Sequence, residues 1–232
     1  MEFYYRSLLT PEQQQLYMLL LHHMGQPQIP CSAQPEDINA AIKAILMDHP
    51  EFCFFEGKWQ LGNGVILPHY SLPPVAAADV QAVASYIRDN FPREDFPWQI
   101  YVWMLHDICY DPAAPNSQNT YGALIQRRAV CKGIAKAYQL LMRQLGIPCI
   151  LVEGTLDGVM KHVWNLVFYN GTWFHVDVTM GYPQFWSLTG ATDIYGGYLR
   201  TTEEISRSHR IFHSEKLPIN INGGERNGTE SM

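Results

Sequence analysis

Hydrophobic residues in the first part of the chain recur at helical spacing in two stretches. Thr10 and Pro11 are typical of a helix start, because threonine caps the first turn and proline fits its first position. Apolar residues on one helical face follow, and a second such pattern predicts a helix over residues 35–47. Aromatic residues on both sides of Glu56–Gly57 predict a short hairpin there. We therefore expect residues 1–70 to form a helical segment with a small β element.

The pattern changes after the turn-rich segment 68–74, which marks a boundary. Apolar spacing then predicts helices over residues 75–90, 98–111 and 131–145, loops over 111–119 and 154–158, and strands over 149–152, 163–169 and 172–178. Helices followed by strands predict an α+β domain, which we place over residues 71–217. Residues 218–232 are rich in Asn, Gly and Glu without periodicity, which predicts a disordered tail.

Composition narrows the class of protein. Apolar residues make up 47% of the chain, charged residues 16%, and the formal net charge is −6, which excludes disorder over the whole chain and argues against a nucleic-acid partner. The apolar run Leu16–Leu21 is far shorter than the about 20 residues of a membrane span, so we expect none. The start lacks the features of a secretory signal, and the five cysteines show no Cys-x-x-Cys pair. A cytoplasmic protein with reduced thiols is expected.

Cys131 stands at the start of the predicted helix over residues 131–145. Unpaired N–H groups at a helix start carry partial positive charge, which stabilises a thiolate and can hold a developing oxyanion. Gly133 lies in the same turn, where it lets a substrate or a neighbouring strand approach closely. The position suits a nucleophile, but a free cysteine is more often a small buried apolar residue, so both interpretations stay open at this point.

His162 and Asp177 fall on one predicted hairpin. The dipeptide Asn170–Gly171 separates two β-rich runs and is the strongest two-residue signal for a hairpin turn. The turn sets a register in which Trp164 lies opposite Asp177 and His162 lies opposite Thr179. His162 and Asp177 are then diagonal neighbours on one face, about 7–8 Å apart at the backbone, so their side chains can meet.

A Cys-His-Asp triad requires this arrangement, with Asp177 orienting His162 and His162 taking the proton of Cys131. His175 lies on the same face and near Asp177, so the geometry does not choose between the two histidines. The apolar neighbours on this face make it largely core, so each histidine also fits a hydrogen-bonded core residue.

Three motifs follow one another in the order Cys, His, Asp: residues 130–135 (VCKGIA), 162–165 (HVWN) and 173–179 (WFHVDVT). Together they resemble the core of the transglutaminase-like superfamily of papain-type thiol enzymes. Upstream segments also look like those of bacterial members, so the resemblance covers about residues 98–180; they are His106–Asp107, Tyr110–Asp111 and Tyr121–Leu124.

The resemblance implies an α+β, papain-like core in which the nucleophile at a helix N-terminus packs on an antiparallel sheet, preceded by a helical segment. It implies that Cys131, His162 and Asp177 are catalytic, and it prefers His162 over His175. Candidates for the substrate cleft are Trp164, Gly133, Tyr121 and Gln126, of which the last two are also candidates for an oxyanion donor.

The implied activity is thiol-dependent acyl transfer at amide bonds through a cysteine thioester. With water the protein is a cysteine peptidase or amidase, which we expect, and with an amine acceptor it is a transamidase. A non-catalytic peptide-binding module that keeps the fold is the alternative. The expected partner is a peptide or protein substrate, joined by an amine acceptor in the transamidase case. No cofactor is expected, because no calcium, phosphate-loop or zinc motif occurs.

Overall fold

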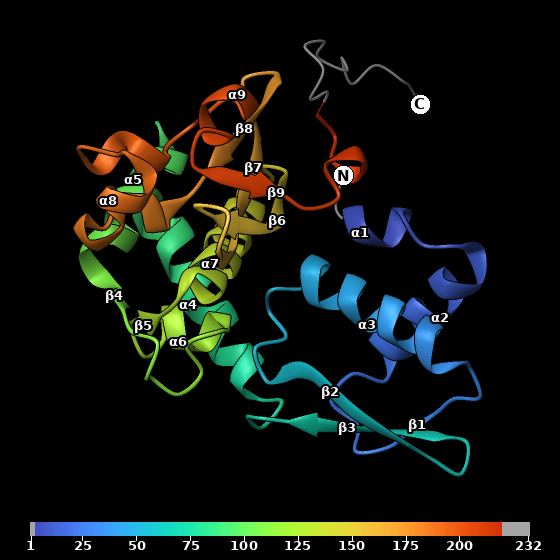
Figure 1. Cartoon of the computed structure of the whole chain (residues 1–232). Coiled ribbons are helices and arrows are strands. Elements are labelled where there is room, and N and C mark those ends of the chain that lie inside the picture. The colour runs from blue at the N-terminus through green and yellow to red at the C-terminus, as the bar shows by residue number, and fades with distance from the viewer. Residues whose placement is uncertain (1–2, 220–232) are drawn as a thin grey trace.

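The computed structural model describes residues 3–219, and its two parts lie side by side in Figure 1. The N-terminal part (residues 3–70) packs three helices against a three-stranded antiparallel sheet of order β1-β3-β2. Its elements are α1 (Tyr4–Ser7), α2 (Pro11–His22), β1 (Ile29–Pro30), α3 (Pro35–Asp48), β2 (Phe55–Gly62) and β3 (Val65–Tyr70).

Local sequence explains most of this part. Thr10 caps α2 as predicted, and Gln13 completes a capping box by bonding back to the Thr10 N–H. The predicted hairpin at Glu56–Gly57 is wrong, because Gly57 lies inside β2, where its positive φ accompanies a register shift in the pairing with β3. The tight turn is at Asn63–Gly64, between the paired residues Gly62 and Val65.

The C-terminal part (residues 71–219) begins with helices and continues with a second sheet. Its helices are α4 (Ala76–Asn90), α5 (Phe96–Asp107), α6 (Thr120–Leu124), α7 (Cys131–Gln144), α8 (Trp186–Thr189) and α9 (Thr202–Ile205). Its strands are β4 (Cys109–Tyr110), β5 (Arg128–Ala129), β6 (Cys149–Leu156), β7 (Met160–Tyr169), β8 (Thr172–Val176) and β9 (His209–Ile211). Short 3-10 turns cover η1 (Val178–Gly181), η2 (Pro183–Phe185), η3 (Ile194–Gly197) and η4 (Ser214–Lys216).

Helices before an antiparallel sheet confirm the predicted α+β class, with some differences in the bounds of the elements. The helix expected to reach residue 111 ends at Asp107, because Cys109–Tyr110 pairs with Arg128–Ala129 as a short parallel ladder. The loop expected over 154–158 is instead strand up to Leu156, and Gly154 pairs with His162. The segment expected as a boundary over 68–74 begins inside β3. Most of the predicted tail lies outside the described residues.

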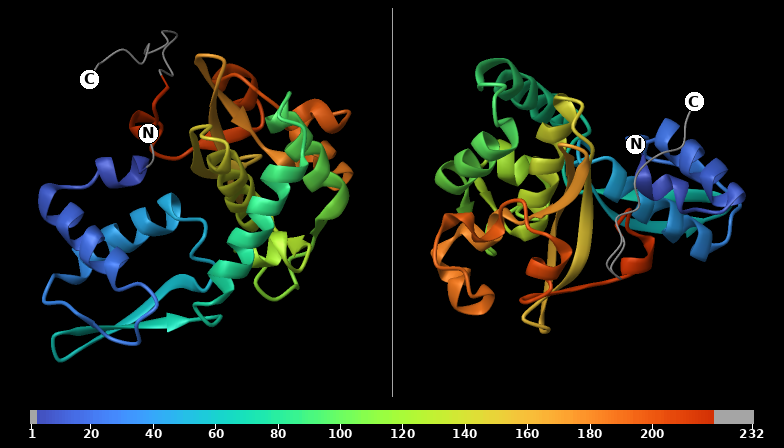
Figure 2. Two further views of the ribbon diagram at one scale, coloured as in Figure 1. Left: turned by 180° about the vertical axis from the view of Figure 1, so that it is seen from behind. Right: turned by 90° about the horizontal axis from the view of Figure 1, so that it is seen from above.

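The four-stranded sheet has the order β8-β7-β6-β9, so the edge strand β9 comes from late in the chain. The Asn170–Gly171 turn joins β7 to β8 in the predicted register, with Tyr169 paired to Thr172 and Asn165 to Val176. Helix α7 packs against β6 and β7, and Asn165 donates to the Ala135 carbonyl of α7 at 2.9 Å. The views in Figure 2 show α7 lying along this sheet.

Hydrogen bonds and an ion pair join the N-terminal part to α7 and β6 of the C-terminal part. Gln139 of α7 donates to the Met47 carbonyl at the end of α3 at 2.9 Å, and Lys43 forms a 2.8 Å ion pair with Glu153 of β6. Tyr5 donates to the Leu151 carbonyl of β6. The division into domains at residue 70 itself stays a prediction. Among residues 3–219, no helix is long and apolar enough to cross a membrane.

Candidate active site

Cys131 is the first residue of α7 and is partly exposed. The preceding N-cap residue, Val130, has an extended backbone and its side chain makes no capping hydrogen bond. The first N–H groups of a helix have no partner within the helix, so they stay available beside the sulfur. The end of α7 therefore supplies both a thiol and hydrogen-bond donors for a negative charge.

Gly133 allows the segment before α6 to pack tightly on the first turn of α7. A Cβ atom at this position would lie 2.3 Å from the Ser117 carbonyl oxygen and 3.0 Å from that of Asn119. Ser117 also accepts a 3.0 Å hydrogen bond from the Val130 N–H. Of the two uses expected for this glycine, the structure shows the close approach of a neighbouring backbone, and it does not place Gly133 on a substrate cleft.

His162 and Asp177 form a buried hydrogen-bonded pair. His162 Nε2 lies 2.7 Å from Asp177 Oδ2, and both residues are 2% exposed. The predicted strand pairing stops short of Asp177, because β8 ends at Val176 and Asp177 caps η1 by accepting the Thr179 N–H on Oδ1 at 2.9 Å. The expected facing of His162 and Thr179 is therefore wrong, although the side chains of His162 and Asp177 meet as predicted.

Charge couples these groups to Cys131. Burial lowers the pKa of His162, but the Asp177 carboxylate and the nearby Cys131 thiol outweigh burial and raise that pKa to about 10. Burial raises the pKa of Asp177, but His162 and His209 outweigh it and bring that pKa well below its usual range. The other nitrogen of His162, Nδ1, is buried without a hydrogen-bond partner among the described residues, so it is the nitrogen available to the thiol.

His175 lies on the same sheet but has different neighbours. Its Nδ1 accepts a 2.9 Å hydrogen bond from the Trp164 indole N–H, so its proton is on Nε2, which lies 3.3 Å from Thr202 Oγ1. Burial, together with the nearby His209, lowers the pKa of His175 to about 3, so the ring stays neutral. These contacts are those of a structural core histidine.

Trp164 has no exposed surface, which corrects the expectation that it lines a substrate cleft. Its ring stacks on His162 with the ring centres 5.9 Å apart, and it meets His209 edge-on at 4.8 Å. Trp164 therefore forms the apolar backing of the histidines.

Among the described residues, neither candidate for a side-chain oxyanion donor, Tyr121 or Gln126, forms a hydrogen bond with Cys131. Tyr121 packs, half-buried, against the core from α6, and Gln126 is exposed and accepts a 3.5 Å hydrogen bond from Asn116. Tyr110 of β4 lies beside the cysteine instead, because β4 pairs with β5, two residues before α7 begins. Burial and the neighbouring Cys131 thiol raise the pKa of Tyr110 to about 12, so its hydroxyl keeps its proton. The sequence showed Tyr110 in one of the upstream segments of the resemblance, Tyr110–Asp111. It did not show that Tyr110 lies beside the thiol.

His209 also belongs to this cluster, and sequence reasoning missed it. Its Nε2 lies 3.1 Å from Asp177 Oδ2, and the residue is 5% exposed. His162, Asp177 and His209 place three potential metal ligands within 4.8 Å of one another. Because both ring nitrogens already bond to the same carboxylate oxygen, hydrogen bonding accounts for the cluster. No sequence motif near His209 signals this contact, because His209 and Asp177 are 32 residues apart in the chain.

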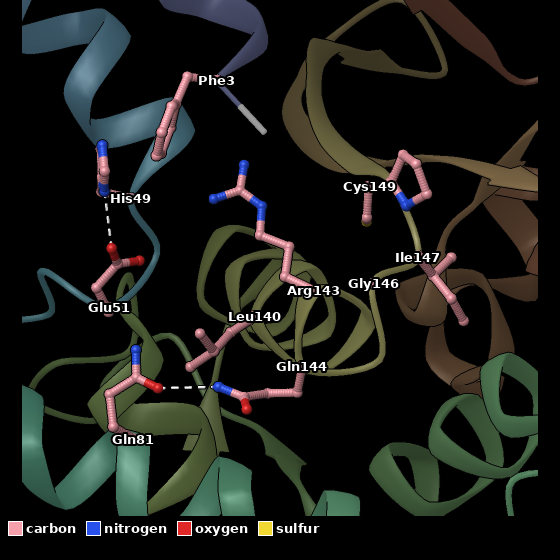
Figure 3. Close-up of a pocket in the computed structure, with 11 residues that line it drawn as sticks. Phe3, His49, Glu51, Gln81, Leu140, Arg143, Gln144, Gly146, Ile147 and Cys149 are labelled. Atoms are coloured by element: carbon pink, nitrogen blue, oxygen red, sulfur yellow. Dashed lines mark hydrogen bonds and ion pairs between the residues drawn. The ribbon is translucent and has the colours of Figure 1, made fainter. Parts of the chain in front are cut away.

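A cavity of about 440 Å³ lies at the far end of α7 from Cys131. Arg143 and Gln144 of α7 line it together with His49 and Glu51 from the N-terminal part, as Figure 3 shows. A helix of this length places the two ends about 20 Å apart, so the cavity and the Cys131 site are separate. None of the predicted site residues lines this cavity.

The fold is an α+β core in which a cysteine at a helix start, a histidine on a strand and an aspartate after the next strand form one group. Residues 74–178 match the family model of the transglutaminase-like superfamily. This match confirms the resemblance seen in the three motifs.

Several known proteins and solved structures are similar to part of this chain. Human and mouse proteins named kyphoscoliosis peptidase are 29% and 28% identical over 98 residues, which cover 35% of this chain but only 15% of each relative. A protein from Cytophaga hutchinsonii, described as a candidate cysteine protease, is 22% identical over 44% of this chain and 37% of its own, with a TM-score of 0.38. A structure described as a TGase is 15% identical over 53% of this chain and 43% of its own, with a TM-score of 0.32.

Selective alkylation of thiols tests the environment of Cys131. At pH 7, iodoacetamide should label Cys131 at least about tenfold faster than the exposed Cys109, because a protonated His162 stabilises the thiolate. The buried thiols should react only after denaturation; they are Cys31, Cys53 and Cys149. Peptide mass spectrometry of native and denatured samples measures these rates. Fastest labelling at Cys109, or an unchanged Cys131 rate in His162→Gln, contradicts the expected coupling.

The His162–Asp177 pair should also make stability depend on pH. The raised pKa of His162 stabilises the fold fully below its unfolded value of about 6.5, and this contribution disappears as pH rises through about 10. The lowered pKa of Asp177 stabilises the fold above about pH 4, and this contribution disappears as pH falls. The difference in Tm between wild type and His162→Gln should therefore be largest between about pH 4 and about pH 6.5. A difference independent of pH would contradict the ion pair.

Proposed function

We propose that the protein catalyses acyl transfer at amide bonds through a thioester on Cys131, and that water is the usual acceptor. The observation that carries the proposal is the buried His162–Asp177 pair, whose free imidazole nitrogen adjoins a thiol at the start of α7. The match of residues 74–178 to the transglutaminase-like superfamily supports thiol chemistry at this site.

In the first half-reaction, the Cys131 thiolate attacks the amide carbonyl carbon. The carbonyl electrons move onto oxygen, and the N–H groups of the first turn of α7 stabilise this oxyanion, with the Tyr110 hydroxyl as a further donor. The C–N bond then breaks as the His162 imidazolium gives its proton to the leaving amine. The products of this half are a free amine, a neutral His162 and a thioester.

In the second half-reaction, His162 acts as a base. Its Nδ1 takes a proton from water while the water oxygen attacks the thioester carbon. Collapse of the new tetrahedral intermediate releases a carboxylic acid and restores the thiolate beside a protonated His162. Asp177 keeps the proton of neutral His162 on Nε2, which leaves Nδ1 free to act in both halves.

An amine in place of water gives transamidation by the same route, so the acceptor decides the class of reaction. Water needs no second binding site, and the human relative is named a peptidase, which together favour hydrolysis. A library of peptides, incubated with and without a primary amine, tests the proposal by mass spectrometry. Cleaved products are expected. Amine adducts alone would replace hydrolysis by transamidation, and binding without any product would leave a peptide-binding module.

A further inference from the structure

We propose that His209 is a positioning residue of the thiol site, which holds the Asp177 carboxylate in the orientation that His162 needs. The inference rests on the proposed function and adds a residue from outside the family core, since the family match ends at residue 178. The site would then have four members in place of three.

The contacts of Asp177 show what His209 contributes. Oδ1 accepts the Thr179 N–H at 2.9 Å, and Oδ2 accepts two imidazole N–H groups, from His162 at 2.7 Å and from His209 at 3.1 Å. Three donors therefore fix the carboxylate in position and rotation. Without His209, one donor remains on each oxygen, so two contacts in place of three hold the carboxylate.

Contacts on both sides hold the His209 ring in one orientation. The Asp177 carboxylate can only accept, so His209 Nε2 carries the hydrogen that faces it, and Nδ1 lies 2.9 Å from the Ser208 hydroxyl. The ring packs edge-on against Trp164 and lies 5.3 Å from the His162 ring, centre to centre. A buried imidazole with a hydrogen bond on each ring nitrogen is a rigid donor.

The sheet brings His209 to this place. Strand β9 pairs with β6, with His209 opposite Leu156 and Ile211 opposite Gly154. A Cβ atom at Gly154 would lie 2.1 Å from the Arg210 carbonyl oxygen and 2.7 Å from Trp164 Cη2, so a side chain there is incompatible with the present position of β9. The glycine of β6 thus permits the approach that the histidine of β9 requires.

The chemical role follows from the charge on Asp177. Each donated hydrogen bond disperses part of the negative charge, so removal of His209 concentrates the charge on the bond to His162. His162 should then hold its proton more tightly and become a weaker acid toward the leaving amine. The titratable groups around Asp177 and His209 come from several elements; they are Tyr101, Tyr110, Cys131, His162 and His175.

Two substitutions of similar size separate positioning from packing. In His209→Gln, the amide nitrogen takes the place of Nε2 and can still donate to Asp177, whereas the shorter His209→Asn cannot reach it. We expect kcat/KM within about threefold of wild type for Gln and a loss of about 10-fold to 100-fold for Asn, mostly in kcat. The alkaline limb of the kcat/KM profile should move upward by more than about 0.5 pH unit in the Asn variant only.

His175→Gln is the matched control, because it removes another buried histidine of the same sheet. It should lower Tm without moving the alkaline limb. The pH profile of Cys131 alkylation, which needs no substrate, should show the same difference between the Gln and Asn variants. Equal kinetics and equal profiles for these two variants of an active enzyme would overturn the role of His209. A wild-type protein without turnover and without enhanced alkylation would instead overturn the proposed function.

Discussion

Replacing Cys131 by alanine should reduce amide turnover by at least about 10⁴-fold, because no other group at the site can form the thioester. The fold should persist, since the cysteine is partly exposed and its side chain is small. Turnover of a peptide selected from the library and Tm from thermal unfolding are measured on the same preparation. We expect a change in Tm of only a few degrees beside the loss of rate.

Cys109→Ala is the control for this substitution. Its thiol is more exposed than that of Cys131 but lies outside the His162–Asp177 cluster, so turnover should stay near wild type. Intact-mass spectrometry should show an acyl adduct on wild type quenched during turnover and none on Cys131→Ala. Substantial turnover by Cys131→Ala would remove the thioester from the mechanism.

The second large effect is expected from Asp177→Asn. An asparagine amide at the place of Oδ2 points N–H groups at His162 Nε2, which must then accept a hydrogen bond and move its own proton to Nδ1. The nitrogen that should take the proton of Cys131 is then blocked. The corresponding change in a serine protease triad costs about 10⁴-fold in kcat, and we expect a loss of similar size here.

A purely structural role for Asp177 makes a different prediction. A satisfied core carboxylate would lower Tm when replaced and leave the rate per folded molecule near wild type. The fraction of Cys31, Cys53 and Cys149 that iodoacetamide leaves unlabelled gives the folded fraction, so kcat and Tm are separable on one sample. An unchanged kcat at a lowered Tm would remove Asp177 from the site.

Much of the site was predictable because its signals are local. The helix start at Cys131 follows from apolar spacing and the stop at Gly146, and Asn170–Gly171 sets the register that brings β8 beside β7. Asp177 was less predictable in detail, because the chain leaves the strand after Val176 and the carboxylate arrives from a 3-10 turn. The contact with His162 was predicted, but by a backbone path that extended the strand two residues too far.

Other features depend on contacts that no short pattern encodes. His209 reaches Asp177 only because β9 joins the sheet beside β6, a pairing between segments far apart in the chain. Trp164 was predicted at the cleft because aromatic residues are common there, but burial by β9 and the histidines decides its place. In the N-terminal part, Asn63–Gly64 carried the same turn signal as Asn170–Gly171, whereas the aromatic residues around Gly57 belong to a single bulged strand.

The hydrogen bond between Asp177 and His209 closes residues 178–208 into a loop whose two ends meet at the site. The entropy of closing a loop grows only with the logarithm of its length, so doubling the excursion costs about 0.6 kcal/mol. Insertions in its exposed part, around residues 187–193, are therefore inexpensive as long as the two ends still meet. Evolution can change this segment, and with it the surroundings of the thiol, while Cys131, His162, Asp177 and His209 stay unchanged.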